Sequence, residues 1–242
     1  MTLLKSLGDA GFQPVCPVPM GFSKDSQIKW AIDGLAPTLP PEVELAQGRD
    51  GVPPVAGCVL ASEAPVSGDE CIGALNLLQG LSKVVFLSRV GVERRDNFMI
   101  KLNPFLKVET WYEAEEAVKA WCSQNGVELT IIRTGNLQGG PFYQSNPEFQ
   151  QALEGSLFDV EHRAMKLSAA DTFDGATSRD LVSVGVVQAL KRDVPVLSLV
   201  SAKDGPLQCS VRNHMKLPPA QTKERVVWTP TDAEWDAAFS QI

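Results

Sequence analysis

The chain has 242 residues, of which 44% are hydrophobic and 21% are charged. This length suits one large domain or two small ones at roughly 150 residues per domain, and the composition excludes a disordered or fibrous chain. The net charge of −7 opposes binding to nucleic acid, because no segregated basic patch offsets it. The uncharged stretches contain Pro and Gly and fall short of the ~20 apolar residues that span a bilayer. We therefore expect no nucleic-acid partner and no transmembrane segment.

Cysteine and histidine do not form a metal-binding pattern. The five cysteines include no C-x-x-C pair, and His162 and His214 lie far apart without ligands at metal spacing. We expect reduced thiols and no metal site. The N-terminus lacks the charged region, apolar run and cleavage site of a signal peptide. This predicts either a cytosolic chain or one whose targeting segment is absent.

The first 80 residues predict helices that alternate with short strands. Apolar residues at helical spacing indicate a helix that ends at Gly11. Prolines interrupt the apolar stretch 14–18 and weaken it as a central strand, because proline cannot donate to the ladder. Further along we expect a helix at 26–35, an extended turn at 37–41, buried strands at 43–46 and 56–61, and a helix at 69–80.

The stretch 83–88 is the clearest strand, since four consecutive apolar residues indicate that both of its faces are covered. Asn103 as a cap and Pro104 in the first turn then predict the start of an amphipathic helix, which Gly126 ends. A strand at 127–132 follows. Strand, helix and strand in this order predict a right-handed βαβ unit with parallel strands.

Ligands of such sheets collect at the carboxyl ends of the strands. This rule places Ser88, Arg89 and residues 133–136 on the functional edge. We interpret Lys107 and the triplet 94–96 as solvated residues. No residue here forms a catalytic pattern by itself.

The second half of the chain predicts one more helix and one more strand. The polar stretch 141–168 has the length of a variable cap, the helix is expected at 181–190, and the final strand at 194–200. We interpret the proline-containing tail as a wrapping arm anchored by Trp228, Trp235 and Phe239. The predicted organisation is a domain at 1–202 that includes a cap at about 141–170, followed by an extended C-terminal arm at 203–242 packed on the domain or on a partner.

Four segments resemble, in order and spacing, landmarks of atypical short-chain dehydrogenase/reductase proteins of the NAD(P)-binding, NmrA-like branch, which has many plastid and cyanobacterial members. The resemblance covers roughly residues 1–200 and implies an α/β fold with a doubly wound parallel sheet, a Rossmann-like fold. In that family a glycine-rich turn after the first strand holds the cofactor pyrophosphate. This chain has no such turn and begins inside the following helix, so we expect an N-terminally truncated or degenerate version. The segments are 83–92, 115–119, 130–137 and 177–182.

Further departures from the family concern catalysis. Catalytic members carry a Tyr and, four residues later, a Lys that lowers the tyrosine pKa. The corresponding residues here are Lys107 and Trp111, which cannot perform this chemistry. Tyr112 is followed four residues later by Glu116, a carboxylate that would raise a phenol pKa. We expect no catalytic residue, and an enzyme would have to use Ser88, Lys107 or Tyr112.

The resemblance also suggests candidate cofactor-binding residues, although no cofactor is expected. If NADP or NAD bound, the candidates would be Ala61, Ser62, Ser88, Arg133, Thr134, Gly135 and Asn136. For Ser88 we favour a turn-capping hydroxyl over one that orients a substrate. For Arg133 we favour contact with backbone carbonyls or a carboxylate over contact with a nucleotide.

Two functions of different class follow. The first is a non-catalytic, dehydrogenase-like scaffold that acts as a structural subunit or assembly factor of a larger organellar complex, photosynthetic or respiratory. Its partners would be protein subunits, and any membrane association would be peripheral and through them. The second is a divergent NAD(P)-dependent reductase or isomerase whose cofactor loop is missing from the sequence. The resemblance places the chain in the plastid stroma or another organelle matrix, and otherwise in the cytoplasm.

Overall fold

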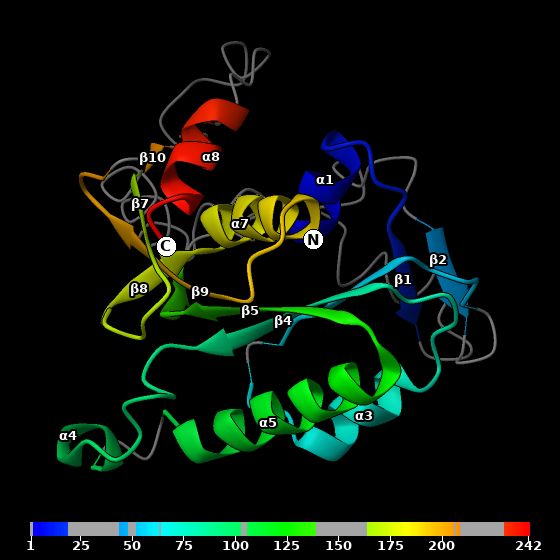
Figure 1. The fold of residues 1–242 in the computed structure, drawn as a ribbon, viewed down its shortest axis with the longest axis horizontal. Coiled ribbons are helices and arrows are strands. Elements are labelled where there is room, and N and C mark those ends of the chain that lie inside the picture. Colours follow the sequence, from blue (N-terminus) through cyan, green and yellow to red (C-terminus); the bar gives the residue numbers. More distant parts are fainter. Residues whose placement is uncertain are drawn as a thin grey trace, which may run out of the picture.

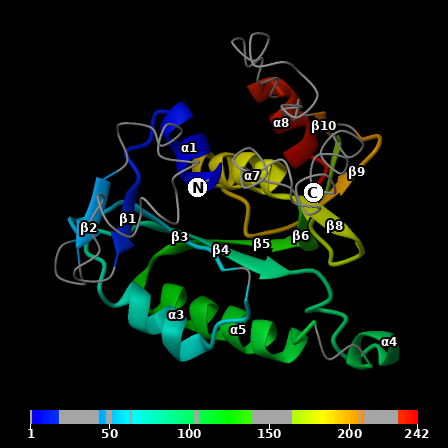
Figure 2. The ribbon, with the colours of Figure 1, turned by 180° about the vertical axis from the view of Figure 1, so that it is seen from behind.

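A computed structural model describes residues 2–18, 44–47, 52–62, 64–102, 106–138, 164–205, 207–208 and 230–242. The predicted helix at 26–35 and turn at 37–41 lie outside the described residues, as do His162, His214 and Trp228. Within the described part, helices cover both faces of a central sheet (Figure 1, Figure 2).

The central sheet has six strands in the order β10-β7-β9-β5-β4-β3. β3, β4, β5 and β9 are parallel neighbours, whereas β7 runs antiparallel to β9 and β10 antiparallel to β7. This mostly parallel sheet confirms the predicted α/β, Rossmann-like fold. The bounds of the strands are Gly57–Leu60 for β3, Lys83–Arg89 for β4, Glu128–Thr134 for β5, Ala164–Ser168 for β7, Val196–Ala202 for β9 and Leu207–Gln208 for β10.

Two short parallel pairs lie outside this sheet. β1 (Val15–Val18) pairs with β2 (Glu44–Gln47), and β6 (Asn136–Gln138) pairs with β8 (Ala176–Ser178). Pro17 lies within β1. A proline cannot donate to a ladder, so its place in a peripheral pair agrees with the expectation that this stretch is no central strand.

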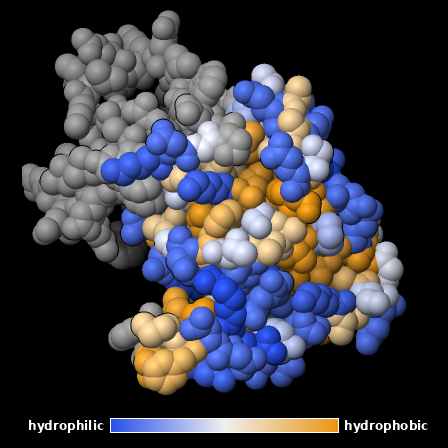
Figure 3. All heavy atoms as spheres, turned by 60° about the vertical axis from the view of Figure 1, so that its left-hand side comes forward, coloured by the Kyte–Doolittle hydropathy of each residue, from blue (hydrophilic) through white to orange (hydrophobic). Residues whose placement is uncertain are grey.

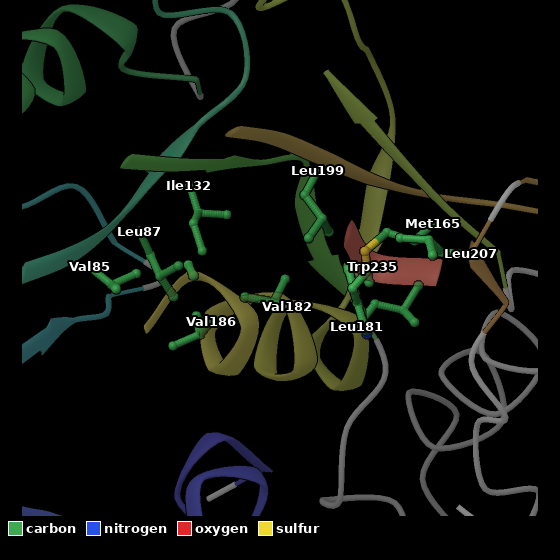
Figure 4. Close-up of a cluster of buried hydrophobic side chains, with 11 residues drawn as sticks. Val85, Leu87, Ile132, Met165, Leu181, Val182, Val186, Leu199, Leu207 and Trp235 are labelled. Carbon is green, nitrogen blue, oxygen red and sulfur yellow. The ribbon is translucent and has the colours of Figure 1, made fainter. Parts of the chain in front are cut away.

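Helices pack on both faces of the sheet. α3 (Gly68–Leu75) and α5 (Val108–Asn125) lie side by side on one face. α7 (Arg179–Lys191) covers the other face, where α1 (Thr2–Asp9) and α8 (Asp232–Phe239) also lie. Alternate residues of β4 point into the two layers, since Val84 and Phe86 pack with α5 while Val85 and Leu87 pack with α7 (Figure 4). The prediction that both faces of this strand are covered is thus confirmed.

Helix ends follow local chemistry, with one exception. α3 begins at a capping box in which the Ser67 hydroxyl accepts from the Glu70 N–H at 3.2 Å, and Glu70 accepts from the Ser67 N–H at 2.9 Å. α5 ends, as predicted, at Gly126, whose φ is 65°.

The predicted start of α5 at Asn103 is wrong. The helix begins at Val108, after Lys107 with a left-handed φ of 45°. An L-residue in this conformation cannot continue a right-handed helix. A short helix that no sequence pattern predicts, α4 (Phe98–Lys101), precedes it. The Asn97 side chain caps this helix by accepting from the Met99 N–H at 2.9 Å.

The C-terminal elements correct two boundaries. Residues 164–168, assigned to the cap, form strand β7 inside the central sheet, and β9 is not the final strand because β10 follows it. In the tail, Trp235 of α8 is fully buried in the cluster beneath α7 and stacks on Phe239, with ring centroids 5.7 Å apart. Among the helices of the described part, none has the length and apolar character needed to cross a bilayer.

Candidate functional site at the carboxyl edge of the sheet

The predicted site residues meet at one edge of the sheet. In register, Leu60 of β3 lies beside Phe86 of β4, and Ser88 of β4 beside Arg133 of β5. These strands end on the left-hand side of Figure 1. Figure 3 turns that side forward and shows hydrophilic surface between two hydrophobic areas. The segments 61–62, 88–89 and 133–136 therefore come from three neighbouring strand ends, as the topology requires.

Ser88 is committed to a buried carboxylate. Its side chain is 4% exposed, and its hydroxyl donates to Oε1 of Glu115 at 2.6 Å. Glu115 lies on α5 and is fully buried. The Ser88 hydroxyl therefore binds a side chain of a distant helix. Among the described residues it makes no local hydrogen bond of the kind that caps a turn.

Arg133 holds the same carboxylate from the neighbouring strand. Its Nε donates to Oε1 of Glu115 at 2.9 Å and its Nη2 to Oε2 at 2.7 Å. A two-point contact of this kind fixes both the position and the orientation of the carboxylate. Of the two protein partners expected for Arg133, backbone carbonyls or a carboxylate, the structure shows the carboxylate.

Two further charged residues complete the network around Arg133. Glu93 binds Nη1 of Arg133, and Lys119 lies 3.8 Å from Oε2 of Glu115. Burial lowers the pKa of Arg133, but hydrogen bonds and charge from Glu115 and Glu93 outweigh it and raise the pKa. Burial likewise raises the pKa of Glu93, and the contact with Arg133 outweighs it, so the pKa falls. Both shifts favour the charged forms of Arg133 and Glu93.

A second buried carboxylate ties the loop after β4 to the loop before β8. Asp171 is 2% exposed and accepts from the Gly91 N–H at 2.8 Å and the Glu93 N–H at 3.0 Å. Arg94 lies 2.9 Å from Asp174 and 3.6 Å from Asp171. The interpretation of 94–96 as a solvated loop is thus wrong for Arg94, because its partners lie about 80 residues away, where no local pattern shows them.

The candidates on α5 do not form a proton relay with Ser88. Lys107 is exposed at the helix start, and Trp111 is 2% exposed in the core. Tyr112 packs beneath Arg95, whose Cζ lies 3.7 Å from the ring centroid. Trp111 packs near Phe86, with ring centroids 6.4 Å apart, which agrees with its interpretation as a core residue.

Three of the remaining cofactor candidates, Ser62, Thr134 and Gly135, use their polar groups within the protein. Thr134 donates to the Ser88 carbonyl at 3.3 Å, and the Gly135 N–H donates to the Thr177 hydroxyl at 2.9 Å. The Ser62 hydroxyl donates to the Ala64 carbonyl at 2.7 Å. The last two candidates, Ala61 and Asn136, are exposed.

Gly135 permits a close approach of two backbone segments. A Cβ atom there would lie 2.2 Å from the Gly175 carbonyl oxygen, which is far inside contact distance. The Asn136 N–H donates to the same carbonyl at 3.1 Å. Gly135 therefore allows the two backbone segments to come close together where β6 begins to pair with β8.

These residues do not fit a dinucleotide in the usual way. The printed sequence contains no G-x-x-G-x-x-G motif, and no described strand end carries a glycine-rich turn of the kind that holds a pyrophosphate. The hydroxyls of Ser62, Ser88, Thr134 and Thr177 all donate to protein acceptors. In the described part of the chain, no group of His, Cys, Asp or Glu has the arrangement of a metal site.

Three acidic residues of this site were not among the candidates: Glu93, Glu115 and Asp171. A signal existed for Glu115, because it lies one turn from Trp111 and next to Ala114 and Val118 on the apolar stripe of its helix. A carboxylate at a core position needs a cationic partner. Nothing local distinguishes Glu93 or Asp171 from solvated loop residues.

No protein-family model and no curated protein matches the chain. Among the solved structures that share its fold are an oxidoreductase and a reductase. The oxidoreductase ylbE from Lactococcus lactis is 13% identical, with a TM-score of 0.52 over 84% of this chain and 86% of that one. Vestitone reductase from alfalfa (Medicago sativa) is 12% identical, with a TM-score of 0.50 over 82% of this chain and 73% of that one. At this identity the likeness supports the Rossmann-like fold, not a function.

Proposed function

We propose that this chain is a non-catalytic, Rossmann-like protein that acts as a structural subunit or assembly factor of a larger complex. The observation that carries the proposal is the hydrogen bond from Ser88 to Glu115. The resemblance to short-chain dehydrogenases implies that a serine near this position would orient a substrate carbonyl. Here the hydroxyl is bound to a buried carboxylate that Arg133 immobilises. An organellar location of the complex is part of the proposal and rests on the resemblance alone.

The chemistry of the neighbouring residues supports the same proposal. Freeing Ser88 would break a bond to a charged group, which contributes ~1.5–3 kcal/mol. A relay would also need a phenol or ammonium beside it, but Lys107 is exposed and Trp111 carries no titratable group. The hydroxyl can therefore neither polarise a carbonyl nor pass on a proton without rearrangement of the network.

The alternative is an NAD(P)-dependent reductase or isomerase. It is favoured by the names of two structures that share the fold, an oxidoreductase and a vestitone reductase. Those names describe proteins that are 13% and 12% identical to this chain, so they carry less weight than the geometry of the site.

Calorimetric titration with NADH and NADPH separates the two functions. We expect no saturable binding below ~1 mM, because the described strand ends offer no pyrophosphate cradle. Micromolar binding, about −8 kcal/mol, would support the reductase and overturn the proposal. Size-exclusion chromatography of the full chain extracted from its source gives the second readout. We expect it to elute with a larger assembly, and elution as a lone monomer would count against a subunit.

A further inference from the structure

Arg89 is a cation at the carboxyl edge for which the described residues offer no partner. It is the last residue of β4, lies opposite Thr134 in register, and is half-buried. Within the described part of the chain it is the one arginine for which the structure gives no hydrogen bond, ion pair or ring contact. The others have partners: Arg94, Arg95, Arg133 and Arg192 each bind a carboxylate, and Arg179 also has an interaction.

The buried carboxylate of Glu115 lies on the opposite face of the sheet from Arg89. Strand alternation places Arg89 on the same face as Val85 and Leu87, which pack with α7. Ser88 points the other way, to Glu115 on α5. An anion that approaches Arg89 on the α7 face would therefore not meet the carboxylate of Glu115, which Arg133 already neutralises.

The environment of Arg89 favours an anion. Burial alone lowers the pKa of Arg89, whereas contacts with carboxylates raise the pKa of Arg94 and of Arg133. A guanidinium has five N–H donors in a planar fork, which matches the two oxygens of a carboxylate or phosphate. Burial removes water from the Arg89 guanidinium, and no described protein acceptor takes the place of that water. A bound oxyanion would remove this cost.

We propose that Arg89 anchors a binding site for a small molecule that carries a carboxylate or phosphate group, at the carboxyl edge on the α7 face. The side chain nearest in register is Thr134, which lies opposite Arg89 at the end of β5. The site goes beyond the proposed function, because an assembly factor and an enzyme could each use it.

The test is calorimetric titration of the full chain with inorganic phosphate and, separately, with succinate, at an ionic strength held constant with sodium chloride. We expect at least one probe to bind saturably, and the stronger of the two identifies the class of oxyanion. In Arg89→Gln we expect affinity to fall at least about ten-fold, because a charged bidentate contact is lost. Arg89→Lys keeps the positive charge but loses the planar guanidinium fork. Its affinity should therefore lie between that of the unaltered chain and that of Arg89→Gln.

Arg95→Gln is the matched control, because Arg95 lies in the next loop and already contacts Glu109 and Tyr112. Its affinity should equal that of the unaltered chain. The proposal is overturned if neither probe saturates at tens of millimolar, or if Arg89→Gln and Arg95→Gln bind alike. Thermal unfolding with and without the probe gives a second readout, and Arg89→Lys keeps the test decisive if Arg89→Gln does not fold. Binding of NADPH would overturn the proposed non-catalytic function, but not this site.

Discussion

Arg133 and Glu115 form a two-point ion pair across the interface between β5 and α5, with N–O distances of 2.9 and 2.7 Å. Neither side chain is more than 2% exposed. Ser88 occupies Oε1 of the same carboxylate. The pair therefore links strand, helix and the serine of the neighbouring strand into one rigid unit.

Replacing Glu115 by Gln should cost about 3–5 kcal/mol of unfolding free energy, because Arg133 would lose its buried counter-charge. Urea unfolding followed by circular dichroism measures this loss. Glu116→Gln is the control, since Glu116 pairs with Lys119 at the exposed surface and contributes ~0–1 kcal/mol. Equal losses in the two variants would show that the buried pair is not the stabilising element described here.

Stability should decrease at acidic pH partly through Glu93. Contact with Arg133 holds the pKa of Glu93 below its ordinary value. A folded-state pKa below the unfolded one stabilises the protein above about pH 4.3, and this contribution is lost as the pH falls through the folded value. We expect Glu93→Gln to weaken the pH dependence of the urea midpoint below about pH 4.3. Glu113→Gln, an exposed carboxylate of α5 without this contact, should leave it unchanged. The effect is small because half of the Glu93 side chain is exposed.

Substitution of Trp111 tests whether this position can accept the lysine that catalytic members of the resembling family carry there. Trp111 is 2% exposed, and its Nε1 has no hydrogen-bond partner. Trp111→Lys should cost more than about 4 kcal/mol, because it buries an unpaired ammonium. Trp111→Phe should cost less than about 2 kcal/mol, since it removes an unpaired donor together with some volume. Thermal unfolding compares the two variants. Equal stability would mean that this position can accept a lysine.

Gly135→Ala should destabilise the chain by about 1–3 kcal/mol, because its Cβ would collide with the Gly175 carbonyl. Gly73→Ala is the matched control. Nothing lies within 4 Å of a Cβ at Gly73, and the residue is exposed within α3, so alanine should add up to ~1 kcal/mol through its helix propensity. Urea midpoints measure both changes. A neutral Gly135→Ala would contradict the close approach of β6 and β8.

The sheet and its helices could be predicted because their signals are local. The apolar run 83–88 marked β4, and Gly126 marked the end of α5. The start of α5 was misplaced because the Asn-Pro pair at 103–104 has the pattern of a helix start, whereas the buried face begins only at Val108. Strand β7 is not predicted because its five residues, Ala-Met-Lys-Leu-Ser, stand at the end of a polar stretch and are too few for their alternation to stand out.

The site could be predicted only as a position, not as a network. Chain order and strand ends placed Ser88 and Arg133 on one edge, which needs only topology. Their shared partner Glu115 lies 27 and 18 residues from them, and Asp171 lies about 80 residues from the loop that it fixes. Such contacts depend on how helices and loops pack on the sheet, so no periodicity along the chain reveals them.

The most direct test of the central claim is a crystal structure of the full chain grown with millimolar NADPH. Our interpretation predicts Ser88 bound to Glu115 and Arg133, and no electron density for a dinucleotide over the carboxyl ends of β3, β4 and β5. Density for the cofactor across Ser62, Thr134 and Asn136, with Ser88 released from Glu115, would contradict it.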